Sequence, residues 1–220
     1  MVSSPLNTRE ELLTSALAIA DAEGLDALTI RELGKVNNLH HTALYRHFAS
    51  KEELIAALLT RLLEQMVTNF SPEKYEPAER LVQLGLLLRR GFAEHPGLIP
   101  ATITTAGPSQ DSNAMQWLAV STMEELGLSG DDLAIRYQAY ENCVLASMFY
   151  DYANYPTHAQ ERMERHRKLA NPAFDAWAGS ESDVELLNYR SFEYALRTLV
   201  AEFVTAGQRA EFSSGADTSR

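Results

Sequence analysis

Apolar residues recur at intervals of three and four along the chain, and no convincing stretch alternates apolar and polar residues. Intervals of three and four place side chains on one face of a helix, whereas a period of two is typical of a strand. The pattern therefore predicts an all-α protein. The expected helices cover residues 9–23, 29–37, 51–70, 77–94, 98–106, 111 or 112 to 126, 131–152, 157–170 and 183–205, and a further short helix ends near residue 48.

Several of the expected helix starts carry capping signals. Thr8 with Glu11, and Ser50 with Glu53, each fit a capping box, in which a hydroxyl and a carboxylate bind the first free amides of a helix. Thr29 can cap the next helix through its side-chain oxygen. These signals predict a compact bundle of three helices in the first 50 residues and a fourth helix that begins at residue 51.

Residues 29–51 are predicted to form two short helices joined by a tight corner. Ile30, Leu33 and Val36 form the expected apolar stripe of the first helix, and Leu44 and Phe48 form an apolar i, i+4 pair on the second. The corner at residues 37–40 begins with two asparagines, the residue type that tolerates a left-handed backbone best after glycine. So short a corner predicts a helix-turn-helix at about residues 29–48, whose second helix can enter a DNA major groove.

The helix-turn-helix stretch is basic, although the whole chain has a formal net charge of −11. Its cations are Arg31, Lys35, Arg46 and Lys51, and Glu32 is its acidic residue. Neutralising phosphates and releasing their counterions supplies most of the non-specific affinity for DNA. An acidic body would repel DNA and leave this stretch as the contact surface. The alternative interpretation is a solvated helical face that happens to be basic.

Helix geometry separates the two sides of the second helix. Since Leu44 and Phe48 define its buried side, Thr42, Ala43 and Arg46 fall on the side that would face the groove. An arginine can bind guanine in a bidentate manner, and threonine and alanine methyl groups can contact thymine. Tyr45 and His47 flank this side, where phosphate binding and a packing role are both open. The candidate DNA-binding residues are Thr29, Arg31, His40, His41, Thr42, Ala43, Tyr45, Arg46, His47 and Lys51.

Composition and local motifs argue against several other classes of protein. The 220 residues are 45% hydrophobic and 22% charged, which are ordinary values for a globular protein and allow one large domain or a small and a larger one. With no apolar run of about 18 residues and no signal peptide, the expected location is the cytoplasm. The single cysteine, Cys143, is expected to be a buried, inert thiol. The six histidines show no metal-ligand spacing, and no phosphate loop or nucleophile motif is present, so we expect no enzyme, no metal site and no cofactor.

The segments TREELLTSALAIADAEG (8–24), LTIREL (28–33) and TALYRHFASKEEL (42–54) resemble the TetR (tetracycline-repressor) family of transcription regulators. The resemblance is strong over about residues 8–60 and only architectural beyond them. It implies a repressor that binds a palindromic operator as a homodimer and releases it when a small molecule enters the helical body. The chain departs from the family pattern at Gly34, usually alanine, at Asn38, usually glycine, and at His40, usually serine or threonine.

The resemblance also implies a domain plan. Residues 1–50 would form the helix-turn-helix DNA-binding domain, residues 51–206 a larger helical ligand-binding and dimerisation domain, and residues 207–220 a disordered tail. Helices at about 131–152 and 183–205 would pair with the same helices of a second subunit. The candidate pocket residues are Phe92, His95, Met115, Trp117, Tyr137, Tyr140, Glu141, Asn142 and Met148, and for most of them a core position is the favoured alternative. The expected partners are double-stranded operator DNA, a second copy of the chain and a small-molecule effector. The rival hypothesis is a helical protein-interaction module without sequence-specific DNA binding.

Overall fold

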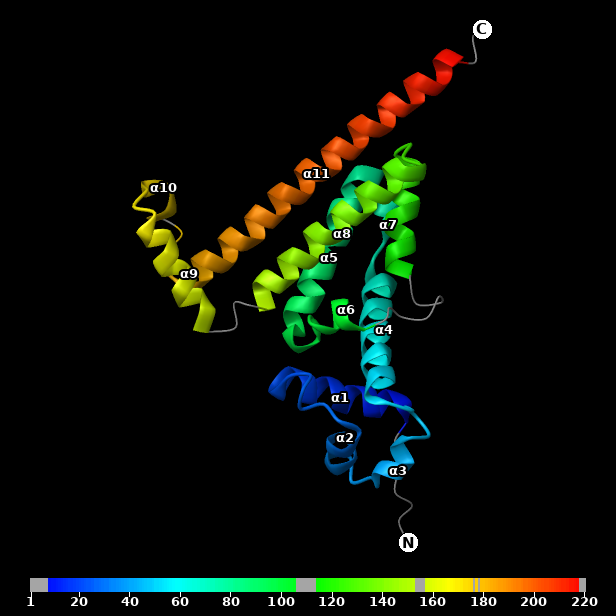
Figure 1. The fold of residues 1–220 in the computed structure, drawn as a ribbon, viewed down its shortest axis with the longest axis vertical. Coiled ribbons are helices and arrows are strands. Elements are labelled where there is room, and N and C mark those ends of the chain that lie inside the picture. Colours follow the sequence, from blue (N-terminus) through cyan, green and yellow to red (C-terminus); the bar gives the residue numbers. More distant parts are fainter. Residues whose placement is uncertain (1–7, 106–113, 153–156, 176, 178, 218–220) are drawn as a thin grey trace. The chain divides into compact units, whose positions relative to one another are not determined.

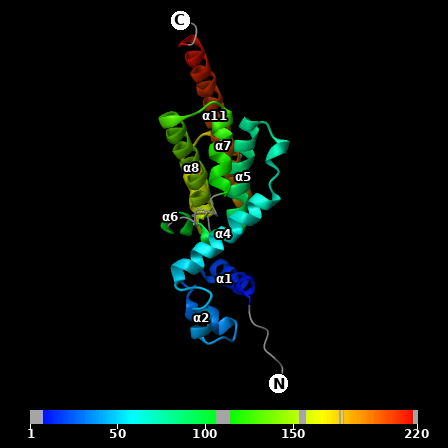
Figure 2. The same ribbon diagram turned by 90° about the vertical axis from the view of Figure 1, so that its right-hand side faces the viewer.

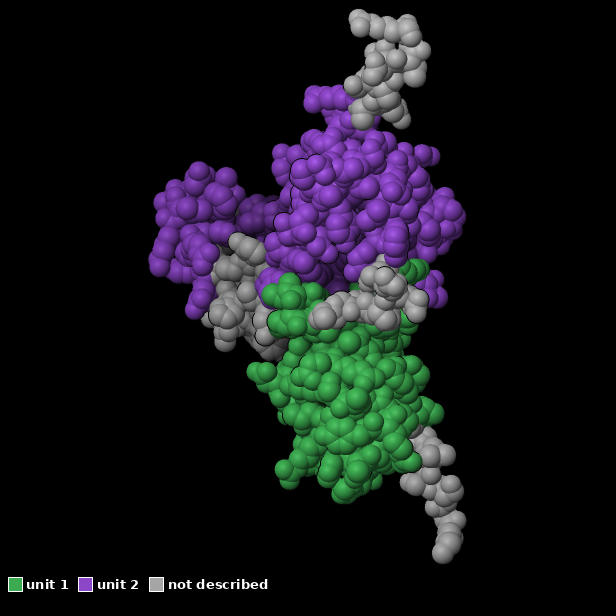
Figure 3. All heavy atoms as spheres, turned by 45° about the vertical axis from the view of Figure 1, so that its right-hand side comes forward, with its two compact units in different colours: residues 1–67, 94–114 green, residues 68–93, 115–220 purple. Residues whose placement is uncertain are grey.

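The computed structural model of the chain describes residues 8–105, 114–152, 157–175, 177 and 179–217. Every regular element within these residues is a helix, which confirms the predicted all-α fold (Figure 1). The chain forms two compact units, each of which draws on two separate stretches of sequence (Figure 3). Unit 1 comprises residues 1–67 and 94–114, and unit 2 comprises residues 68–93 and 115–220.

Unit 1 contains the helices predicted for the first part of the sequence. They are α1 (Arg9–Glu23), α2 (Ile30–Val36), α3 (His41–Leu44) and α4 (Lys51–Asn69), joined after residue 94 by the 3-10 helix η2 (Pro96–Leu98) and by α6 (Ala101–Thr104). At α1, Glu11 N–H donates to Thr8 Oγ1 (3.2 Å) and Thr8 N–H donates to Glu11 Oε2 (2.7 Å). At α4, Ser50 Oγ accepts from Glu53 N–H (3.2 Å), and the Glu53 carboxylate accepts from Ala49 N–H (2.7 Å). Local capping signals therefore predict both helix starts correctly.

The predicted apolar stripe of α2 is wrong at one position. Ile30 and Leu33 are buried as expected, but Val36 is 52% exposed. Successive side chains on a helix are about 100° apart, so Gly34 shares the face of Ile30 and Leu33, whereas Val36 lies beside that face. Gly34 is accordingly the third buried residue of α2.

Residues 94–114 belong to unit 1 although α5 before them and α7 after them belong to unit 2. Within unit 1, η2 packs against α1: His95 Nδ1 lies 2.8 Å from Asp21 Oδ2. A Cβ atom at Gly97 would overlap the backbone carbonyl of Ala20, so only glycine allows this approach. Unit 1 thus extends beyond residue 50, and the boundary expected there between a DNA-binding and a ligand-binding domain stays a prediction.

Unit 2 contains α8 (Gly130–Tyr152) and α11 (Glu181–Asp217), which run side by side in opposite directions (Figure 1, Figure 2). The 3-10 helix η1 (Pro72–Lys74), α5 (Pro77–Glu94) and α7 (Ala114–Glu125) precede them, α9 (Thr157–Lys168) packs against α11, and α10 (Pro172–Asp175) packs against α9. Buried side chains of the unit include Leu81, Leu84 and Phe92 of α5, Met115 and Met123 of α7, Tyr140, Val144 and Met148 of α8, and Val184, Phe192, Leu196, Val200 and Phe203 of α11.

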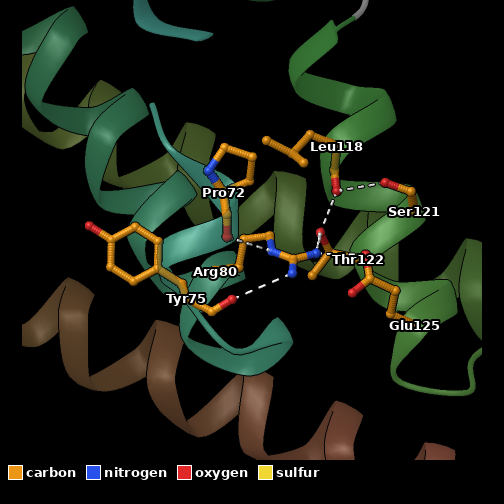
Figure 4. Close-up of polar contacts among 7 residues, drawn as sticks. All are labelled: Pro72, Tyr75, Arg80, Leu118, Ser121, Thr122 and Glu125. Carbon is orange, nitrogen blue, oxygen red and sulfur yellow. Dashed lines mark hydrogen bonds and ion pairs between the residues drawn. The ribbon is translucent and has the colours of Figure 1, made fainter. Parts of the chain in front are cut away.

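Arg80 of α5 connects two elements of unit 2 that the sequence does not link (Figure 4). Its Nε donates to Pro72 O (3.1 Å) and its Nη2 to Tyr75 O (3.4 Å), at the two ends of η1. Its Nη1 lies 2.6 Å from Glu125 Oε1 and 3.5 Å from Thr122 Oγ1, both on α7. One guanidinium, which has five N–H donors in a fixed plane, therefore holds η1 against α7.

Helix α11 continues through residues for which the sequence predicts a disordered tail. The prediction begins at residue 207, whereas the helix ends at Asp217, and residues 218–220 lie outside the described part of the chain. Ala206 and Gly207 are buried, and a Cβ atom at Gly207 would overlap the carbonyl oxygen of Leu126. Close packing at Gly207 therefore reaches the first residue of the segment whose polar composition indicates disorder, and disorder of the residues after it stays a prediction.

The predicted helix start at residue 111 or 112 lies outside the described residues, and α7 begins at Ala114. None of the helices in the described ranges is long and apolar enough to cross a membrane. The same ranges contain no group of three or more His, Cys, Asp or Glu side chains placed to hold a metal ion.

Candidate nucleic-acid interface

The corner between α2 and α3 is closed by a pair of backbone hydrogen bonds around a left-handed asparagine. Leu39 N–H donates to Gly34 O (2.8 Å), and Asn38 N–H donates to Lys35 O (3.3 Å). Asn38 has a φ of 53°, in the left-handed region that glycine adopts most easily. A Cβ atom at Gly34 would lie 2.8 Å from Leu39 O. Gly34 and Asn38, two departures from the family pattern, therefore accommodate the same tight turn.

The side chain of Asn37 fastens this corner to α1. Its Nδ2 donates to Leu33 O (2.9 Å), and its Oδ1 accepts from Ser15 Oγ (3.0 Å). The sequence marks Asn37 only as a turn residue, because its partner on α1 lies 22 positions away. The corner is consequently held from both sides, by the turn itself and by α1.

The left-handed backbone at Asn38 gives a prediction for the corner's stability. Asn38 is exposed, so substitutions there change mainly the cost of the positive φ. We expect Asn38→Ala to destabilise unit 1 by about 1 kcal/mol, because a Cβ-bearing residue without a short polar side chain pays more for this conformation. We expect Asn38→Gly to be neutral or stabilising by up to about 1 kcal/mol. Thermal unfolding of both variants checks the order, and an Ala variant as stable as the Gly variant would contradict it.

The side chains of α3 and the turn after it divide into a buried and an exposed set, as predicted. Leu44 and Phe48 have no exposed surface. Most of the candidate DNA-binding residues on this segment are exposed, and Ala43 and His47 are half-buried. The regular α-helix is short, since α3 ends at Leu44 and continues as a hydrogen-bonded turn to Phe48. The exposed set comprises His40, His41, Thr42, Tyr45 and Arg46.

Three aromatic rings form a row along the exposed side of α3. The ring centroids of His40 and His41 are 4.2 Å apart, and the ring of His41 meets the edge of Tyr45 at 6.4 Å. Tyr45 is 52% exposed, so this row does not bury it. The packing contact of Tyr45 with His41 thus lies at the surface, and a phosphate contact of Tyr45 stays a prediction.

The positive charge of the stretch is concentrated in a few side chains. Lys35 Nζ lies 3.1 Å from Glu32 Oε1, so these two charges compensate each other. Arg31 and Arg46 are exposed, and Lys51 Nζ lies 3.5 Å from Asp26 O. Thr29 Oγ1 accepts from Glu32 N–H (3.0 Å) as the N-cap of α2, a bond that leaves the hydroxyl proton available for donation.

Arg9, at the start of α1, adds a cation that the sequence did not single out. Its Cζ lies 5.0 Å from the centroid of the Phe48 ring, and the residue is exposed. A guanidinium over an aromatic face is held by the ring quadrupole. The contact spans 39 positions between Arg9 and Phe48, so no local pattern indicates it. The structure therefore places a cation of α1 beside the end of residues 41–48, that is, α3 and the turn after it, which we call the recognition segment.

The candidate pocket residues do not form one group. Phe92, Met115, Tyr140 and Met148 are buried in unit 2. Tyr137 and Glu141 are half-buried on α8, whereas Asn142 is exposed and Trp117 is 66% exposed. His95 lies in unit 1, where it contacts Asp21. A pocket role for the unit 2 residues stays a prediction.

Burial raises the pKa values of Tyr137, Tyr140 and Cys143 on α8. Tyr140 Oη donates to Leu81 O (2.7 Å), and burial raises the pKa of Tyr140 far above its usual value. Burial, then the nearby Glu141 carboxylate, also raises the pKa of Tyr137, whose hydroxyl lies 3.3 Å from Glu141 Oε1. Burial also raises the pKa of the Cys143 thiol, which agrees with an inert thiol, but the residue is half-buried and not buried as predicted.

Arg89 is a buried cation of unit 2 that sequence reasoning did not identify. It is 5% exposed, its Nη1 donates to Asn188 O (3.1 Å), and its Cζ lies 5.4 Å and 5.3 Å from the ring centroids of Tyr189 and Phe192. In the sequence, the only indication of its burial is that Arg89 lies next to the apolar stripe of α5. Buried guanidinium groups are uncommon unless they are well partnered, and here α11 provides several of the partners.

Comparisons with known proteins agree with the geometry of unit 1. The family model described as bacterial regulatory proteins, tetR family, matches residues 12–58. Relatives named nucleoid occlusion factor SlmA, from Escherichia coli and Citrobacter koseri, are 33% identical over 97 residues, which are 42% of this chain and 48% of theirs. The chain thus spans about half the length of these curated relatives.

Solved structures resemble the whole chain. Apo ActR from Streptomyces coelicolor has a TM-score of 0.74 at 24% identity, covering 95% of this chain and 100% of its own. ActR in complex with (S)-DNPA has a TM-score of 0.71 at 24% identity, with coverages of 93% and 100%. A TetR variant from Acinetobacter baumannii in complex with minocycline has a TM-score of 0.66 at 20% identity, with coverages of 89% and 96%. At these identities the likeness establishes the fold.

Proposed function

This chain is a member of the TetR family of bacterial regulatory proteins by its N-terminal domain, and we propose that it is a transcriptional repressor. It binds a palindromic operator as a homodimer and leaves the operator when a small molecule enters unit 2. The observation that carries the proposal is the exposed surface of α3, which lies opposite the buried Leu44 and Phe48 and follows a closed helix-turn-helix corner. The chain acts without catalysis.

In the proposed complex, α3 lies in the major groove. Arg46 binds a guanine through its two parallel N–H groups, and the methyl groups of Thr42 and Ala43 contact thymine. Tyr45, Arg31 and the start of α4 at Lys51 contact phosphates and fix the position of α3. The exposure of Thr42, Tyr45 and Arg46 supports these assignments.

A second copy of the chain covers the exposed faces of α8 and α11. Ile135 of α8 is 65% exposed, and Leu186 and Tyr194 of α11 are 44% and 76% exposed. The two α11 residues are eight positions apart, which places them on one side of the helix. Large exposed apolar side chains on these two helices favour an interface, and these are the helices that the family resemblance assigns to the dimer.

The ligand of unit 2 is a small molecule whose chemistry is open. Support comes from two of the similar solved structures, which contain (S)-DNPA in ActR and minocycline in TetR. On α8, Tyr137 and Glu141 supply half-buried polar groups 3.3 Å apart, beside the buried Tyr140. Half-buried polar groups next to apolar side chains are typical of ligand sites, so we assign the polar ligand contacts to Tyr137 and Glu141.

Selection of bound sequences from random double-stranded DNA tests the proposal. We expect an inverted repeat whose half-site centres lie about 34–36 Å apart, or a multiple of that distance, because a two-fold dimer presents two copies of α3. The affinity should fall steeply with salt concentration. If the folded protein enriches no sequence and retards no genomic DNA at low salt, the rival hypothesis of a helical protein-interaction module gains and the repressor is excluded.

A further inference from the structure

Arg9 is an exposed cation whose side chain is held at one flank of the recognition segment. Its Cζ lies 5.0 Å from the centroid of the Phe48 ring, and Phe48 has no exposed surface. The guanidinium therefore covers a ring that is otherwise enclosed in the core of unit 1. Because the ring attracts a cation over its face, the contact limits the positions that this long side chain adopts.

The guanidinium of Arg9 keeps its full capacity for hydrogen bonds. Within the part of the chain that the structure describes, no carboxylate or carbonyl group accepts from it. The acidic residues next to it are engaged elsewhere, since Glu10 Oε2 lies 3.2 Å from Arg61 Nε. The Glu11 carboxylate accepts from Thr8 N–H (2.7 Å). Five N–H donors and an uncompensated positive charge thus remain for a partner from outside the chain.

The place of Arg9 in the fold decides what this partner can be. Phe48 lies on the buried side of the recognition segment, whereas Thr42 and Arg46 are exposed. A cation over Phe48 is therefore at the flank of the reading surface and not among the side chains that would meet base edges. The groups that flank a helix in the major groove face the phosphates of the strands that border it.

We propose that Arg9 is a phosphate-binding residue of the operator complex and holds α1 against the DNA backbone. This role rests on the proposed operator binding and extends the contact surface to a helix outside the helix-turn-helix. A guanidinium matches a phosphate with two parallel N–H groups. Because every base pair presents the same phosphates, Arg9 contributes affinity and orientation but no preference between sequences.

The Phe48 ring prepares Arg9 for this contact. A mobile arginine side chain loses rotamer entropy when it is immobilised at an interface. The ring already restricts the guanidinium in the free protein, so less of that entropy is lost on binding. Since Phe48 ends the recognition segment, a phosphate bound to Arg9 fixes α1 and that segment together.

The salt dependence of operator binding tests this role. Arg9→Gln removes the charge and keeps a polar side chain. Each phosphate contact contributes about −0.9 to the slope of log affinity against log salt concentration, and a dimer carries Arg9 twice. The ratio of the wild-type affinity to that of Arg9→Gln should therefore fall about tenfold between about 50 and about 200 mM salt. Arg9→Lys, which keeps the charge, should retain the wild-type slope.

Arg165→Gln is the matched control. It removes the same charge from an exposed position on α9 of unit 2, and its salt slope should equal that of the wild type. On the selected operator and on a duplex with an altered guanine, Arg9→Gln should lose affinity by the same factor. Arg46→Ala should instead reduce the difference between the two duplexes. Thermal unfolding establishes that each variant is folded at the temperature of the titration.

The outcomes separate the role of Arg9 from the proposed function. A wild-type salt slope in Arg9→Gln, even with a lower thermal stability, would show that Arg9 only supports Phe48 and would overturn the phosphate contact. An equal change of slope in Arg165→Gln would overturn it as well, because overall charge would then explain the effect. Both results leave the repressor intact. A wild-type protein that binds no DNA at any salt concentration would refute the repressor, and the contact of Arg9 with it.

Discussion

Arg46→Ala is expected to abolish sequence-specific operator binding while the protein stays folded and dimeric. Arg46 is exposed, whereas Leu44 and Phe48 on the same segment are buried, so its removal leaves no cavity. A bidentate arginine–guanine pair contributes about 1–3 kcal/mol of discrimination, and a dimer on a palindrome loses two such pairs. The expected loss is therefore about 2–6 kcal/mol, roughly 30-fold to 10⁴-fold in affinity. Titration of the selected operator, and of the same duplex with the guanine replaced, measures it.

The matched control removes an arginine of equal charge from unit 2. Arg165 on α9 is exposed, so Arg165→Ala changes the net charge as Arg46→Ala does and should leave operator affinity within about twofold. Equal losses in both variants would indicate that only overall charge matters. Unchanged binding of Arg46→Ala to the operator would show that α3 does not place Arg46 in the groove.

The parts of the fold that the sequence predicts are those specified by neighbouring residues. Thr8 with Glu11, and Ser50 with Glu53, mark helix starts because a cap joins groups only three positions apart. The corner is predicted for the same reason, since Asn38 adopts its left-handed backbone within a turn that its own neighbours close. Helix periodicity likewise predicts that Leu44 and Phe48 are buried.

The parts that the sequence does not predict depend on contacts between distant residues. His95 is expected to supply a polar contact in a ligand pocket, yet it contacts Asp21, 74 positions earlier. In the sequence Gly97 only marks the end of a helix, whereas in the structure its lack of a side chain allows a close approach to Ala20. Periodicity reports which face of a helix is apolar but not which helix covers it, so the assignment of residues 94–114 to unit 1 was not accessible.

The candidate site shows the same division. The choice of Thr42 and Arg46 as groove-facing residues followed from two buried neighbours on the same short segment. Arg9 was missed because its place beside Phe48 depends on how α1 packs against the rest of unit 1. Trp117 is expected in the pocket as an apolar or amphipathic residue of a helix, yet it is exposed, because aromatic character does not determine on which side of α7 a residue falls.

Phe48→Ala is expected to cost unit 1 about 3–5 kcal/mol of stability, the usual effect of truncating a fully buried phenylalanine. Alanine keeps the backbone hydrogen bond from residue 48 N–H to Leu44 O (2.9 Å), but it removes the buried ring that lies beneath Arg9. Loss of the ring should unfold the segment and remove operator binding together with stability. Tyr45→Ala, three positions earlier and 52% exposed, is the control and should change stability by less than about 0.5 kcal/mol.

Because the chain has two compact units, hydrogen exchange is the appropriate measurement for Phe48→Ala. Amides of α1 to α4 should lose protection in this variant, while those of α8 and α11 keep it, since Phe48 belongs to unit 1 alone. Equal loss in both units would mean that they unfold as one cooperative body. Full protection of α1 to α4 would contradict the burial of Phe48, and with it the side of the recognition segment that faces DNA.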